Sequence, residues 1–236
     1  MGDRDEKHDL KPGRADVGHA VAKGLVSQIP ALGGIAAEFI GLYVAAPASK
    51  RRDEWIKSLD DRVTALEDTV EGFQRDSLQE NEMFVTAFLH AAPIAIRSHQ
   101  EEKWDALRNA VLHAALRDPP DDALQLMFLH HIDVLTPWHL RVLEYLEDPR
   151  AWLVGAGVSF DGLRSGSRAT LLEQAFAELK GRREFYEQIV RDLYARGLVS
   201  TDSLSGMVTA QGMMQPLTTE TGKRFLDFIS SPAARR

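Results

Sequence analysis

The chain contains no cysteine among its 236 residues, and this absence removes several kinds of site at once. It has no disulfide, no thiolate metal ligand and no cysteine nucleophile. The H-E-x-x-H, P-loop and G-x-S-x-G patterns are also missing, so no motif points to metalloprotease, nucleotide or hydrolase chemistry. We expect no catalytic residue, no metal site, no cofactor and no small-molecule ligand. A cysteine-free chain suits a reducing cytoplasm, and membrane association is the alternative.

An excess of basic residues is missing as well. The chain carries a formal net charge of −7. Residues 1–136 hold 15 Lys and Arg against 23 Asp and Glu, a net charge of −8, while residues 137–236 hold 13 against 12, a net charge of +1. Neither half therefore has the basic surplus that predicts binding to a phosphate backbone. Apolar residues make up 44% of the chain, which is enough to bury a core and excludes disorder of the whole chain.

A long hydrophobic run occurs once, over residues 24–48, where Glu38 is the only charged residue. Pro30 and Pro47 interrupt the run, so we expect one helix from residue 31 to 46. Such a helix is about 24 Å long, which is short against a hydrocarbon core of about 30 Å. The length favours a buried helix in a soluble protein over a membrane span.

Small residues recur at every fourth position of this expected helix and form one ridge along it, which lets another backbone approach closely. The ridge comprises Gly33, Ala37, Gly41 and Ala45. It suits a buried contact, self-association into a homo-oligomer, or conditional insertion into a membrane. In the membrane hypothesis the basic residues 50–52 would face anionic lipid.

The first 136 residues are expected to be helical throughout after a disordered tail over residues 1–15. A long helix capped by Asp53 has apolar residues at alternating spacings of three and four, which is typical of a short coiled coil or a helical hairpin. This seam comprises Ile56, Leu59, Val63, Leu66, Val70 and Phe73. Self-association through the seam and ordinary packing onto neighbouring helices are both open.

Further helices are expected over residues 81–97, with a kink at Pro93, and from the capping pair Ser98 and Glu101 to residue 115. The Asp-Pro-Pro-Asp stretch at 118–121 ends that helix and opens the next one. The expected buried stripe of this next helix comprises Leu124, Met127, Phe128, His131 and Leu135. Residues 16–136 thus form an all-helical domain.

The character of the chain changes in residues 137–236. A helix over 137–147, started by a threonine and a proline, precedes a flexible loop over 149–169 that is rich in glycine and serine. The loop has room for one short strand at 152–154. The remaining expected elements are helices over 170–180, 182–196 and 219–229, and strands at 198–199 and 213–217.

This order of elements resembles a winged helix-turn-helix domain over about 90 residues. The stretches that carry the resemblance are IVRDLYARGLV at 189–199 and PLTTETGKRFLDFI at 216–229. Members of this family place their third helix in the DNA major groove and a basic wing on the backbone. The resemblance implies the following DNA-reading residues: Arg182, Arg183, Gln188 and Arg191.

The charges around that helix favour protein contact over DNA binding. Glu184, Glu187 and Asp192 share the helix with the arginines, and the expected wing at 200–212 contains no Lys or Arg. The salt-dependent attraction to phosphates is therefore largely missing.

Histidines and glycines offer two weaker chemical hypotheses. His130 and His131 point about 100° apart on a helix, so they are expected to be structural and not metal ligands. Gly155 and Gly157 give only part of a dinucleotide-binding pattern, because Phe160 stands where its third glycine should be.

The sequence therefore predicts a mainly α protein with an N-terminal multi-helix region and a C-terminal winged-helix-like α+β domain. Its expected function is that of a non-enzymatic regulatory or interaction protein, which self-associates through the helical region and uses the winged helix for protein contact. A DNA-binding transcriptional regulator is one alternative. A membrane-inserting effector of the defence or toxin kind, acting through residues 24–48, is the other.

Overall fold

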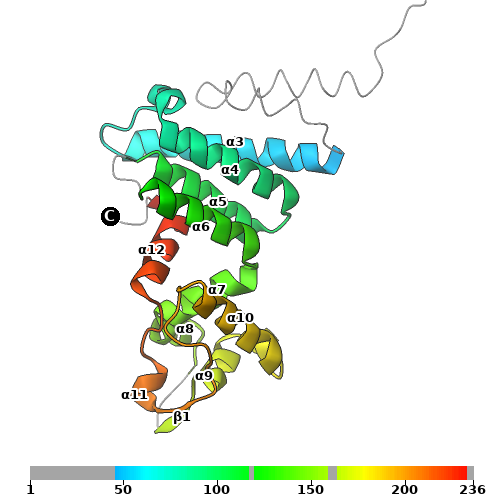
Figure 1. Cartoon of the computed structure of the whole chain (residues 1–236), viewed down its shortest axis with the longest axis vertical. Helices are drawn as coiled ribbons and strands as arrows, with labels where there is room; N and C mark the ends of the chain where they lie inside the picture. The colour runs from blue at the N-terminus through cyan, green and yellow to red at the C-terminus, as the bar shows by residue number, and fades with distance from the viewer. Residues whose placement is uncertain (1–45, 117–119, 159–163, 233–236) are drawn as a thin grey trace, which may run out of the picture.

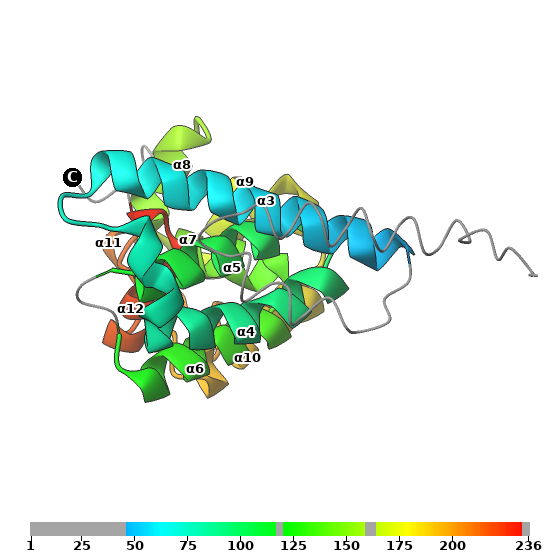
Figure 2. The same cartoon turned by 90° about the horizontal axis from the view of Figure 1, so that it is seen from above.

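The computed structural model of the chain describes residues 46–116, 120–158 and 164–232. The protein is mainly helical, with a small two-stranded sheet near its C-terminal end. The first part, which we call the helical bundle, comprises the helices α3 (Ala46–Thr69), η1 (Arg75–Glu80), α4 (Glu82–Arg97), α5 (Glu101–Ala114) and α6 (Asp122–Val134). Helices α4 and α5 pack between α3 and α6, and Figure 2 shows this layering from above.

The second part, which we call the C-terminal region, lies below the bundle in Figure 1. It comprises α7 (Pro137–Glu147), α8 (Pro149–Gly155), β1 (Ser165–Ser167), α9 (Arg168–Ala175), η2 (Ala177–Leu179), α10 (Arg183–Ala195), β2 (Met207–Thr209), α11 (Ala210–Met213) and α12 (Glu220–Ile229). Strands β1 and β2 are antiparallel, with Gly166 opposite Val208.

Helix α3 begins seven residues earlier than expected. Pro47 lies in its first turn, where a proline without an N–H group is tolerated, and Asp53 lies inside the helix instead of capping it. The expected helix over residues 31–46 and the Gly33 to Ala45 ridge otherwise lie outside the described residues.

The apolar seam of α3 packs against other helices of the same chain. Ile56, Leu59, Val63 and Leu66 are 3% exposed or less, because they pack against α4 and α5. Val70 and Phe73, at and beyond the helix end, are only partly buried. The spacing thus predicted a buried face correctly, and four of the residues expected to drive self-association lie in the core of a single chain.

Helix starts in the bundle follow from side-chain caps. Asn81 accepts a hydrogen bond from the Phe84 N–H at 3.1 Å, and Asp121 accepts one from the Leu124 N–H at 3.0 Å. Helix α5 starts at Glu101 after Gln100, and not at Ser98, whose hydroxyl instead accepts from the Gln100 N–H at 3.3 Å.

Two expectations for the C-terminal region are wrong. Residues 149–155 form α8 and not a loop or a strand, since Asp148 caps the helix by accepting from the Ala151 N–H and Pro149 occupies its first position. The helix expected over 170–180 breaks at Phe176, whose buried ring packs edge-on against Trp138 and Tyr145. Packing of this ring accounts for the break.

The return strand expected at 213–217 is also replaced. Met213 ends the short helix α11, which Thr209 caps by accepting from the Gly212 N–H at 3.1 Å. The chain then bridges at Thr218, which pairs with Val199 in antiparallel fashion. Helix α10 ends as expected at Gly197, which adopts φ 69°, and Thr219 caps α12.

Helix α12 joins the two parts, because it packs on α5 of the bundle as well as on α7. Asn109 of α5 donates from its side-chain amide to the Ile229 carbonyl at 2.7 Å, and the His113 ring lies 3.0 Å from the Ser230 carbonyl. The last helix in the sequence is therefore part of the bundle's core.

Candidate functional site

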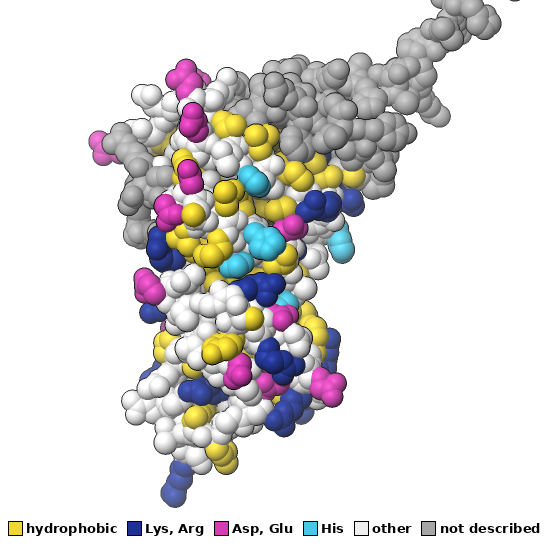
Figure 3. All heavy atoms as spheres, in the orientation of Figure 1, with side chains coloured by type: hydrophobic (Ala, Val, Ile, Leu, Met, Phe, Trp, Pro, Cys, Tyr) yellow, Lys and Arg dark blue, Asp and Glu magenta, His cyan; other side chains and the backbone are white. Residues whose placement is uncertain are grey.

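A groove with an apolar floor lies between α4 and α6. It encloses about 420 Å³. We call it the α4–α6 groove; it is lined by Leu89, His90, Pro93, Ile94 and Arg97 from α4 and by Leu126, Leu129, His130 and Asp133 from α6. Figure 3 shows hydrophobic and histidine side chains gathered on this face of the bundle.

Two partly exposed leucines line the groove, one on each helix. Leu89 is 42% exposed and Leu126 is 40% exposed, while Ile94 and Leu129 are buried below them. Leucines exposed to this degree in an otherwise well-packed bundle mark a surface that another apolar element can cover. Pro93 lies in the same wall and has no N–H to donate to the Leu89 carbonyl, which leaves that helix hydrogen bond unmade.

The rim of the groove is polar. At one end Arg97 donates to both carboxylate oxygens of Asp133, at 3.0 and 3.1 Å. Lys103 donates to the Asp133 backbone carbonyl at 2.7 Å, and burial lowers the pKa of this lysine despite the neighbouring carboxylate. His90 and His130 are exposed on the rim. An apolar floor with a hydrogen-bonding rim is the usual anatomy of a protein-binding site.

The sequence did not predict this groove. It placed the buried stripe of α6 on a set that includes Leu124 and Met127, whereas Met127 is 37% exposed and Gln125 is buried at 1%. Gln125 is held inside by a hydrogen bond to the Met83 carbonyl. The available signal was that Leu89 and Leu126 are apolar residues that lie off the expected buried faces of their helices.

The four residues expected to read DNA lie on α10 or at its start, and all are exposed. Each already has a local contact. The Arg182 guanidinium lies 4.2 Å from the centre of the Phe185 ring, and Arg183 donates to the Ser205 hydroxyl. Arg191 donates to Gln188, which in turn donates to Asp192 at 2.8 Å. The structure therefore leaves all four exposed but engages them with the protein's own groups.

The histidines of the α6–α7 junction are structural. His139 Nδ1 accepts the Thr136 N–H at 3.1 Å, so the neutral ring carries its proton on Nε2, which faces Asp192 at 3.3 Å. Burial lowers the pKa of His139, although Asp192 opposes this. His131 is buried against Phe128 and Phe225, and burial together with Arg196 lowers its pKa to about 4.

Neither ring nitrogen of His131 has a hydrogen-bond partner among the described residues. Within the same part of the chain, no group of three or more His, Cys, Asp or Glu side chains could hold a metal ion. The partial glycine pattern does not follow a strand, as a dinucleotide-binding turn would. Gly155 ends the helix α8, and Gly157 comes two residues later with φ 68°.

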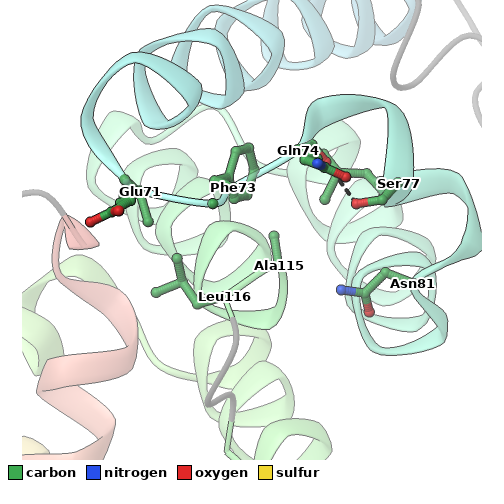
Figure 4. A pocket seen from close by; sticks show the side chains of 10 residues that line it. Glu71, Phe73, Gln74, Ser77, Asn81, Ala115 and Leu116 are labelled. Carbon is green, nitrogen blue, oxygen red and sulfur yellow. Dashed lines mark hydrogen bonds between the residues drawn. The ribbon is translucent and has the colours of Figure 1, made fainter.

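Two further hollows lie among the described residues. The one in Figure 4 lies at the end of α3 and encloses about 250 Å³. Phe73 and Leu116 line it, and Gln74 accepts from Ser77 through its backbone carbonyl. Among the described lining residues, Glu71 is the charged one. The second hollow, of about 410 Å³, includes Arg62, which is already bonded to Asn109 and Asp105.

The basic residues after the apolar run are not arranged for lipid binding. Arg51 donates to the Ile96 carbonyl at 2.9 Å, and Arg52 is only 4% exposed beside Asp53. Lys50 is the exposed member, and it pairs with Glu54. Across the described ranges, no helix is long and apolar enough to cross a membrane; residues 24–45 of the run lie outside these ranges.

Comparison of the chain with protein-family models, with curated proteins and with solved structures finds no match. Function must therefore be argued from the surfaces themselves.

Proposed function

We propose that this chain is a non-enzymatic interaction protein of the regulatory kind, which binds protein partners, copies of itself included, through the α4–α6 groove. The exposure of Leu89 and Leu126 over a buried floor carries the proposal. A groove between two packed helices is a common docking site for an amphipathic helix, whose apolar side chains enter the groove while its polar side chains meet the rim.

The winged-helix-like C-terminal region supplies a second contact surface in this proposal. Tyr194 on α10 is 50% exposed, and tyrosine is enriched in protein interfaces. The loop after α10 has no basic residue between 200 and 212. An exposed tyrosine beside self-paired arginines fits a protein partner better than a phosphate backbone.

The two alternatives have less support. A DNA-binding regulator would have to release Arg183 from Ser205 and Arg191 from Gln188 before either arginine could reach DNA. A membrane effector would lack the expected basic flank, since Arg52 is buried and Arg51 is bonded to α4.

Co-expression of two differently tagged full-length copies tests the proposal. Capture through one tag reports the other copy and every other bound protein. Leu126→Glu places a charge in the groove and should lower the recovery of at least one protein by about tenfold. Val154→Glu is the matched control, because Val154 is 63% exposed on α8, outside the groove. Equal recovery from wild type, Leu126→Glu and Val154→Glu would contradict the proposal.

A further inference from the structure

Helices α4 and α6 run in the same direction on either side of the groove. Near their starts, Gln125 of α6 donates from its side-chain amide to the Met83 carbonyl of α4 at 3.2 Å. Near their ends, Arg97 of α4 donates to the carboxylate of Asp133 of α6 at 3.0 Å. The first residues of both helices therefore lie at one end of the groove, and their last residues lie at the other end.

The end at which the two helices start is acidic. Glu82 is the first residue of α4 and Asp122 is the first residue of α6, and both are exposed. Glu82 lies seven residues before Leu89, and this spacing places both on one face of α4. Asp122 lies four residues before Leu126 and shares a face of α6 with it in the same way. Arg97 is the only Lys or Arg of either helix, so neither helix supplies a basic residue at this end.

The end at which the two helices finish is basic, although it also holds a carboxylate. The Arg97 side chain is 63% exposed while it pairs with Asp133. Lys103, at the start of α5, donates to the Asp133 backbone carbonyl, so two cations stand against one carboxylate. Glu101 and Glu102 do not alter this balance, because Glu101 is bonded within α5 and Glu102 lines the separate hollow of about 410 Å³. This end therefore keeps a surplus of positive charge.

We propose that the α4–α6 groove pairs with the same face of a second copy of the chain, turned antiparallel to it about a two-fold axis that runs across the two helices. This inference rests on the proposed function, because it names the partner at the same site. A two-fold interface of this kind has to be complementary to itself. In the antiparallel arrangement the acidic end of each copy meets the basic end of the other, whereas a parallel arrangement would bring like ends together.

The exposed leucines lie where the two-fold axis would pass. Leu89 comes seven residues after Glu82 and eight residues before Arg97, so it lies within about 1 Å of the midpoint between these two charged residues along the helix. Leu126 lines the same groove from α6. Turning one copy over the other therefore brings the two leucines of each copy together at the centre and leaves the charged groups at both ends. An apolar centre with a polar rim is the usual arrangement of a protein interface.

Charge reversal at the two ends of the groove tests the inference in the purified full-length chain. We expect the wild type to approach twice the chain mass of 26.3 kDa in sedimentation velocity as its concentration rises. Glu82→Arg and Arg97→Glu, made separately, each turn both end contacts of the two-fold pair from attractive to repulsive. Each variant should therefore raise the dissociation constant of the dimer by about tenfold.

A mixture of the two variants separates a lost contact from a damaged fold. The Glu82→Arg chain carries two bases at these positions and the Arg97→Glu chain carries two acids, so each end of a mixed pair again joins opposite charges. We expect the mixture to recover the wild-type dissociation constant to within about threefold. Asp68→Arg, an exposed charge reversal near the end of α3, is the matched control and should leave this constant unchanged.

A wild type that keeps the single-chain mass up to about 100 µM would overturn the inference. A dimer that Asp68→Arg weakens as much as Glu82→Arg does would overturn it as well, and so would a mixture that stays as dissociated as its two components. These results leave the proposed function to its own test. If the capture experiment recovers a different protein, and Leu126→Glu lowers its recovery, the groove remains a binding site and the second copy is excluded as its partner.

Discussion

The interior of the helical bundle and the exposed face of α10 use their polar side chains in opposite ways. In the bundle, Arg108 and Asn109 are buried and bonded across helices, Arg108 to the Ser58 hydroxyl at 2.7 Å. On α10, Gln188 and Arg191 are exposed and bond to each other. The bundle thus takes polar groups inward and leaves leucines outside, whereas α10 covers itself with self-paired polar groups. The exposed leucines of the bundle, and not the polar face of α10, are therefore the basis of the proposed binding surface.

The largest expected loss of stability comes from a substitution in α12, the helix that joins the two parts. A Cβ at Gly222, in the first turn of α12, would overlap the Leu198 carbonyl oxygen. Gly222→Ala should therefore lower the free energy of unfolding by about 3 kcal/mol, because backbone atoms have to move. Urea unfolding measures this change. Gly206→Ala, where a Cβ meets nothing within 4 Å, should stay within about 0.5 kcal/mol of wild type.

Removing a buried hydrogen bond should lower the free energy of unfolding by less than Gly222→Ala does. It should still lower this value by more than removing an exposed hydrogen bond. Asn109→Ala deletes the donor to the Ile229 carbonyl and the acceptor for Arg62. We expect a loss of about 2 kcal/mol in the free energy of unfolding, because the Ile229 carbonyl stays buried without its donor. Gln188→Ala on α10 should change this value by less than about 0.5 kcal/mol. Equal losses in urea unfolding would contradict the contrast between the two regions.

The bundle should also be the more acid-sensitive part, through His131. Its folded pKa of about 4 lies below the ordinary value of about 6.5, so protons favour the unfolded chain. The stabilising contribution is complete above about pH 6.5 and is lost as the pH falls toward 4, by about 2 kcal/mol between pH 7.5 and 5.

Urea unfolding at these two pH values measures the acid sensitivity. His131→Leu should reduce the difference between them, while His90→Ala, an exposed change on α4, should leave it intact. His139 contributes in the same direction, because burial lowers its pKa too. An unchanged pH dependence in His131→Leu would show that the burial of this ring does not set it.

Substitutions on the two candidate surfaces should differ in their effect on binding, while neither should change the free energy of unfolding by much. Leu126→Glu should alter the free energy of unfolding by no more than about 0.5 kcal/mol, because the side chain is already partly in solvent. Arg182→Ala plus Arg183→Ala should have no effect on duplex DNA binding at low salt, since we expect none in the wild type. Measurable duplex binding by fluorescence anisotropy, lost in the double variant, would instead support the DNA-binding hypothesis.

The sequence predicted the bundle better than the C-terminal region for a physical reason. Long helices such as α4 repeat their apolar residues several times, and caps such as Asn81 mark their ends. Helix α8 has only seven residues, and Phe176, where α9 ends, packs against two rings of the distant helix α7. A helix of seven residues is too short to show a clear apolar period. Contacts between segments that are distant in the chain cannot be read from a single sequence.

The candidate site was harder to predict than the fold. The α3 seam and the exposed leucines have the same apolar character, yet Leu59 is buried in the core and Leu126 lies on the surface. Only the packing of α6 against α4 decides which apolar residues remain uncovered. The four residues expected to read DNA are exposed, and their contacts with Phe185, Ser205 and Asp192 depend on the folded geometry.

The central claim is that the α4–α6 groove contacts another protein, and photo-crosslinking from inside the groove tests it most directly. A benzophenone amino acid is placed at position 126 of the full-length chain in the expressing cell, and at position 154 as the exposed control. We expect adducts heavier than the single chain from position 126 and none from position 154. Only intramolecular adducts from position 126, or the same heavy adducts from both positions, would contradict it.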